Sequence, residues 1–139
     1  MLSHAVQYVG DAYDHSTPLG PIDGAGFKAA IDDFPWAAQH AQWDKAQEGP
    51  LPCLILRAEV DQRELWVTAL GGEPGDAYQL QSVSIQMRKS LFGKPKAQHD
   101  ATAFDVDDRA TVDQLIDLFA SASYAQLDAQ VQRLARESD

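Results

Sequence analysis

Three large side chains with useful chemistry lie close together in the segment FPWAAQHAQW, residues 34–43. A helix turns about 100° per residue, so Trp36, His40 and Trp43, spaced four and three residues apart, share one side of a helix. The indole rings could stack on a sugar, a nucleobase or a cation, or anchor a protein partner. The same spacing also suits packing against a sheet beside Trp66. These interpretations stay open, and Trp36, His40 and Trp43 are the first candidates for partner binding.

No recognisable catalytic or metal-binding motif accompanies these side chains. The histidines are His4, His15, His40 and His99. None of their spacings matches the close helical spacing of a zinc site. Asp14 precedes His15 and Asp100 follows His99, but side chains adjacent in sequence rarely face each other as a general base requires. Cys53 lies in the apolar segment PLPCLIL, which does not stabilise a thiolate. We therefore expect no catalytic residue, no metal and no cofactor.

A short acidic segment, DVDD, is the second candidate site. It contains Asp105, Asp107 and Asp108 but lacks the glycine and the terminal glutamate of a calcium-binding EF-hand loop. Such carboxylates can steer a basic protein partner toward the surface. They can also simply form a solvated turn or favour the start of a helix. We predict Asp105, Asp107 and Asp108 as partner-binding residues.

A basic segment interrupts the acidic chain. No acidic residue lies between Asp76 and Asp100, and this interval holds four cations. They are Arg88, Lys89, Lys94 and Lys96. We predict an anion-binding loop here, and an ordinary surface loop is the alternative.

The overall charge limits the kinds of partner. The chain has 139 residues with 21 acidic and 11 basic side chains, for a formal net charge of -10. Such a chain repels phosphate backbones and anionic lipids, so we expect no nucleic-acid and no membrane partner. A basic protein is the partner that this charge favours. The single cysteine, and an N-terminus without the pattern of a signal peptide, indicate a cytoplasmic protein.

The elements that must position these residues indicate one α+β domain. Residues 1–23 should form a strand and loop region, in which DHSTPLGPIDG is a loop. An apolar stripe predicts a helix over 24–34, and Pro35 separates it from a second helix over 36–47. Antiparallel strands follow within 53–107. In residues 78–87 the alternation changes phase, which predicts a bulge near Ser82 or a strand buried on both faces.

The C-terminal region, 111–137, should contain two more helices. The patterns TVDQ and SYAQ match capping boxes, so we expect helices over 112–122 and 124–136, with Thr111 as the first cap. Strands followed by helices predict an antiparallel meander of three to five strands, with two N-terminal and two C-terminal helices mainly on one face.

These observations favour a small acidic non-catalytic protein-interaction domain. Such a domain could be an inhibitor, an immunity-type protein or an adaptor that binds a basic protein. The alternative is a small-ligand-binding or enzymatic domain. Its pocket would lie between helices and sheet, lined by Trp36, His40, Trp43 and Trp66.

Overall fold

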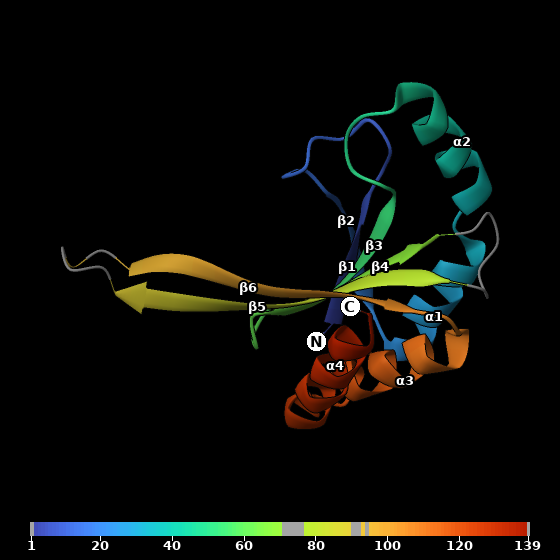
Figure 1. Ribbon diagram of the computed structural model, residues 1–139. Coiled ribbons are helices and arrows are strands. Elements are labelled where there is room, and N and C mark those ends of the chain that lie inside the picture. Colours follow the sequence, from blue (N-terminus) through green and yellow to red (C-terminus); the bar gives the residue numbers. More distant parts are fainter. Residues whose placement is uncertain (1, 71–76, 90–92, 94, 139) are drawn as a thin grey trace.

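The computed structural model describes residues 2–70, 77–89, 93 and 95–138. Within these residues the chain forms an antiparallel sheet and two pairs of helices (Figure 1). The strands are β1 (Leu2–Gln7), β2 (Thr17–Ile22), β3 (Cys53–Ala58), β4 (Arg63–Ala69), β5 (Tyr78–Lys89) and β6 (Pro95–Val106). The helices are α1 (Gly24–Asp33), α2 (Trp36–Ala46), α3 (Arg109–Ala120) and α4 (Tyr124–Ser138). The α+β class and the antiparallel sheet are confirmed.

The sheet has six strands in the order β2-β1-β3-β4-β5-β6, so the prediction of three to five strands was wrong. The missed strand is β2, which occupies most of the segment expected to be a loop. Pro18 and Pro21 lie in this strand. Prolines are tolerated there because β2 is an edge strand and needs hydrogen-bond donors on one side only. The sheet is also not a simple meander, since β3 pairs with β1 rather than with β2.

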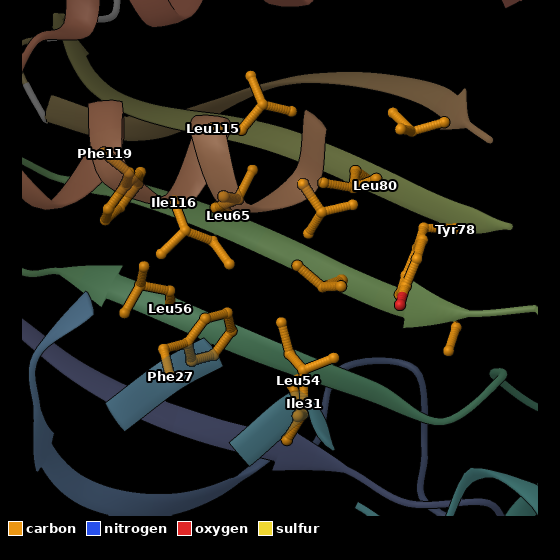
Figure 2. Close-up of a cluster of buried hydrophobic side chains, with 14 of the residues drawn as sticks. Phe27, Ile31, Leu54, Leu56, Leu65, Tyr78, Leu80, Leu115, Ile116 and Phe119 are labelled. Carbon is orange, nitrogen blue, oxygen red and sulfur yellow. The ribbon is translucent and has the colours of Figure 1, made fainter. Parts of the chain in front are cut away.

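The main core fills the space between one face of the sheet and helices α1, α3 and α4. Figure 2 shows Phe27 and Ile31 from α1, and Ile116 and Phe119 from α3, packed over side chains of the central strands. All four of these side chains are buried. Apolar residues recur on these helices at the spacing of one face, so each helix buries a continuous stripe against the sheet.

Strand β5 shows no bulge at Ser82, because its pairing with β4 and β6 keeps a continuous register. The alternative prediction, a strand buried on both faces, accounts for the change of phase. Tyr78 and Leu80 are buried in the main core, whereas Val83, whose side chain points the opposite way, is buried on the other face. Strands β5 and β6 are also longer than expected, and their hairpin projects beyond the rest of the sheet (Figure 1).

Helix α3 begins one turn earlier than predicted. Its N-cap is Asp108 rather than Thr111, and an Asp108 carboxylate oxygen accepts a hydrogen bond from the Thr111 amide at 2.6 Å. Aspartate is a strong N-cap residue, and TVDQ therefore lies inside the helix. The prediction of Thr111 as the cap was wrong because two overlapping cap signals compete in this segment.

Candidate functional site

The face of the sheet opposite the main core carries a small second cluster. Ala5, Cys53 and Ile55 are buried there, and Trp66 packs against them. These residues alternate along their strands with core residues, so they point away from α1, α3 and α4. We call this side, defined by Ala5, Cys53, Ile55 and Trp66, the open face.

Two adjoining hollows of about 400 Å³ each lie on the open face. Both are lined by Gln7, Tyr13, Trp66 and Gln81, so they form one groove. One end of the groove reaches Cys53 and Thr68. The other end reaches Asp14, His15, Arg57, Glu64 and His99.

The wall of this groove is the connection between β1 and β2, and Gln7 holds it in place. The Gln7 side chain is only 4% exposed. Its amide nitrogen lies 3.0 Å from the main-chain oxygen of Tyr13, 3.1 Å from that of His15 and 3.3 Å from that of Ala12. A buried amide that contacts three carbonyl groups of one loop holds that loop in place. The wall is therefore built into the fold, and the Tyr13 ring at its edge remains 73% exposed.

The charged groups on the floor of the groove neutralise each other. Glu64 accepts hydrogen bonds from the Trp66 indole at 2.9 Å and from Arg57 Nε at 2.7 Å. Arg57 also donates to the Ser16 hydroxyl at 3.1 Å. An ion pair of this kind fixes the orientation of the indole. The resulting surface offers aromatic rings and amide groups, and its floor contributes little net charge.

The Trp36, His40 and Trp43 side chains divide between core and surface. Trp36 is 1% exposed and donates from its indole to the Ile31 main-chain oxygen at 2.8 Å. His40 Nε2 lies 2.6 Å from the main-chain oxygen of Ala69, and the half-buried Trp43 indole donates to Gly49 at 3.1 Å. Trp36 therefore offers no surface to a partner. The other two side chains tie α2 to neighbouring segments.

The pocket that we expected between helices and sheet is not formed by the four predicted residues. Trp36 belongs to the main core, whereas Trp66 lies on the open face. The space between helices and sheet is filled with apolar side chains (Figure 2). Spacing along a helix shows which side chains share a side, but it does not show which face of a sheet that side meets.

The three predicted acidic residues lie together at the C-terminal end of β6. Asp105, Asp107 and Asp108 are exposed and border a hollow of about 480 Å³, which we call the acidic hollow. Residues of α3 and α4, Thr111, Arg133, Glu137 and Ser138 among them, form its other side. The hydrogen bond from the Thr111 amide lowers the pKa of Asp108 below its ordinary value. Asp108 thus has a structural role as a cap in addition to any binding role.

The side chains of the four predicted anion-binding residues are not among those that the structure describes. Lys94 lies outside the described residues, and so do the side chains of Arg88, Lys89 and Lys96. Their backbones place Arg88 and Lys89 at the end of β5 and Lys96 near the start of β6, so these three belong to the hairpin strands.

Cys53 has the setting of an inert thiol. It is 5% exposed, and burial raises its pKa to about 12. At neutral pH the thiol is therefore protonated and not nucleophilic. Among the residues that the structure describes, no three histidine, cysteine, aspartate or glutamate side chains gather as metal ligands would.

Reasoning from the sequence missed the groove. Its signal was present in two glutamines, Gln7 on β1 and Gln81 on β5, which share a face with Trp66. That relationship depends on strand order, and the pairing of β3 with β1 across a long connection is not visible in local patterns.

Comparisons with protein-family models, with curated proteins and with solved structures found no match for this chain. In the described part of the chain, no helix has both the length and the apolar character needed to cross a membrane.

Proposed function

We propose that the protein is a non-catalytic interaction domain that binds a basic protein partner, as an inhibitor, an immunity-type protein or an adaptor would. One observation carries this proposal: five of the seven cations whose side chains the structure describes are already paired internally. The pairs are Lys28 with Asp117, Arg57 with Glu64, Arg63 with Asp128, Arg109 with Asp32 and Asp113, and Arg133 with Glu137. Among the residues whose side chains the structure describes, carboxylates without an ion-pair partner outnumber such cations, and this acidic excess suits a cationic partner.

The acidic hollow is the part of the surface best suited to such a partner. Asp105 and Asp107 form no ion pair with any described residue, and both side chains are exposed. Exposed carboxylates accelerate association with an oppositely charged protein and make binding sensitive to salt. We propose a cytoplasmic protein whose partner is neither a nucleic acid nor a membrane, since both carry negative charge.

Affinity capture from the native lysate tests this function. We would compare the wild type with the triple variant Asp105→Asn, Asp107→Asn, Asp108→Asn, in which the last change keeps the helix cap. The matched control is Asp33→Asn, Asp44→Asn, Glu48→Gln, which removes as many exposed charges near α2. We expect basic proteins to be retained at low salt by the wild type and by the control, and to be lost with the triple variant. Equal capture by all three proteins would contradict the proposal.

A second function, binding of a small ligand, is favoured by the groove on the open face. Each of its two hollows has a volume within the range of known ligand sites, roughly 300–1,000 Å³. Trp66 forms part of its lining, so a bound molecule should change tryptophan fluorescence. In a metabolite screen, a ligand of this groove would shift the wild-type emission but not that of Trp66→Phe. If no compound in the screen stabilises the protein against thermal unfolding, this second function is eliminated.

A further inference from the structure

Strand β6 is an edge of the sheet, and one end of that edge is closed by helix α4. The amide nitrogen of Asp105 lies 3.0 Å from the Ser138 hydroxyl, and the Asp105 main-chain oxygen lies 3.3 Å from it. Both main-chain groups of Asp105 therefore point away from β5, the strand that pairs with β6 in the described part of the chain. Ser138 satisfies them as a neighbouring strand would.

The next three outward positions along this edge are open. Main-chain groups alternate in direction along an antiparallel strand, so those of Ala103, Ala101 and His99 point to the same side as those of Asp105. No hydrogen bond joins these outward groups to another residue in the described part of the chain. The side chains of Ala103, Ala101 and His99 are exposed, and two of the three are small. An incoming strand would meet little steric obstruction.

The opposite edge of the sheet differs in the features that discourage pairing. Strand β2 contains Pro18 and Pro21, which lack an N–H donor, and its pairing with β1 has an irregularity at His4 and Ala5. Such devices protect edge strands from other chains. Between His99 and Ala103, β6 has neither a proline nor an interruption of its register with β5. A regular, unprotected edge of this kind is a template for another strand.

We propose that the edge of β6 from His99 to Ala103 binds an extended segment of the basic partner as an added strand. This inference rests on the proposed function and specifies how the partner is held. Charge selects the occupant: a second copy would bring together two chains of net charge -10. A basic segment would instead approach Asp100 on β6 and the acidic hollow at the end of the same edge. Main-chain hydrogen bonds would supply affinity, and these carboxylates would select cationic side chains.

The probe is a labelled peptide that alternates lysine with valine. Its length of about ten residues is at the upper end of usual strand lengths, so it can span the whole open segment. The same peptide with every backbone amide N-methylated keeps the charge but cannot donate strand hydrogen bonds. Fluorescence anisotropy at low salt would be measured for the wild type, for Ala101→Pro and for Ala101→Val. Proline removes the outward N–H donor of residue 101, which faces Val83 of β5 without bonding to it, whereas valine keeps this donor.

We expect the unmodified peptide to bind the wild type and Ala101→Val equally. Ala101→Pro, which removes one donor, and the N-methylated peptide, which cannot donate to any of the three outward carbonyl groups, should each weaken binding about tenfold or more. Equal binding of both peptides to the wild type would overturn strand addition and leave the proposed function standing, whether or not Ala101→Pro folds. Failure of both peptides to bind would overturn strand addition, whereas the affinity capture described above decides the proposed function. Concentration-dependent dimerisation through this edge, seen by sedimentation, would assign it to a second copy instead and overturn the inference.

Discussion

The side-chain amide nitrogen of Gln7 lies 3.0 Å from the main-chain oxygen of Tyr13, which connects the end of β1 to the wall of the groove. The amide makes two further contacts with the same loop, and it is almost completely buried. A local hydrogen-bond network therefore gives the wall of the groove its shape.

Replacing Gln7 tests that dependence. Gln7→Leu has a similar size but leaves three loop carbonyl groups without their donor, so we expect the free energy of unfolding to fall by about 1–3 kcal/mol. Urea denaturation measures the loss, and hydrogen exchange should show faster exchange in residues 8–16. The exposed Gln79 lines the same groove and provides the control, Gln79→Leu. Equal stability of the two variants would refute a structural role for Gln7.

The buried position of Trp36 predicts an unequal effect of the two tryptophans of α2. Trp36→Ala should lower the free energy of unfolding by about 3–5 kcal/mol, because it leaves a large cavity in the core. Trp43→Ala should cost roughly 1 kcal/mol, since Trp43 is half-buried and loses one hydrogen bond. Chemical denaturation of both variants measures the two losses in free energy of unfolding. A larger cost for Trp43 would mean that the helix is turned differently.

The buried thiol of Cys53 should be unreactive while the protein is folded. With its pKa raised to about 12 by burial, almost none of it is thiolate at neutral pH. We expect modification by iodoacetamide to be very slow in buffer and rapid in denaturant, with mass spectrometry as the readout. Rapid labelling of the folded protein would show that the open face admits reagents to Cys53.

The cap formed by Asp108 predicts a dependence of stability on pH. Its pKa is lower in the folded protein than in the unfolded chain, so the capping contribution is present above the unfolded pKa and is lost as pH falls through the folded pKa. Asp108→Asn keeps an acceptor but does not titrate. Below roughly pH 4, the wild type should therefore lose more stability than this variant, in thermal unfolding followed by circular dichroism. Parallel curves for both proteins would exclude the cap as the cause.

The helices and the central strands could be predicted because their signals are local. Apolar stripes located α1, α3 and α4, and Pro35 marked the boundary between α1 and α2. The alternation of side chains in β5 also predicted, as one of two alternatives, a strand buried on both faces. Leu80 and Val83 are indeed buried on opposite faces. What failed was the interpretation of segments in which two local rules conflict. Prolines indicated a loop, although an edge strand accepts them at Pro18 and Pro21.

The groove and the open edge depend on relationships that local patterns do not contain. Gln7 and Trp66 line one groove only because β1 pairs with β3, and β3 pairs with β4. Ser138 reaches Asp105 only because α4 crosses back to the last strand. The acidic segment is visible in the sequence. The hollow that it forms with residues of α3 and α4 is visible only in the structure.

The most direct test of the proposed function is a titration of the protein with the basic partner recovered from the lysate, at low and at high salt. We predict that the dissociation constant rises steeply with ionic strength, because screening weakens attraction between exposed charges. The Asp105→Asn, Asp107→Asn, Asp108→Asn variant should already bind weakly at low salt and respond less to added salt. A dissociation constant that is unchanged by salt and by these three substitutions, or the recovery of no partner at all, would contradict the account.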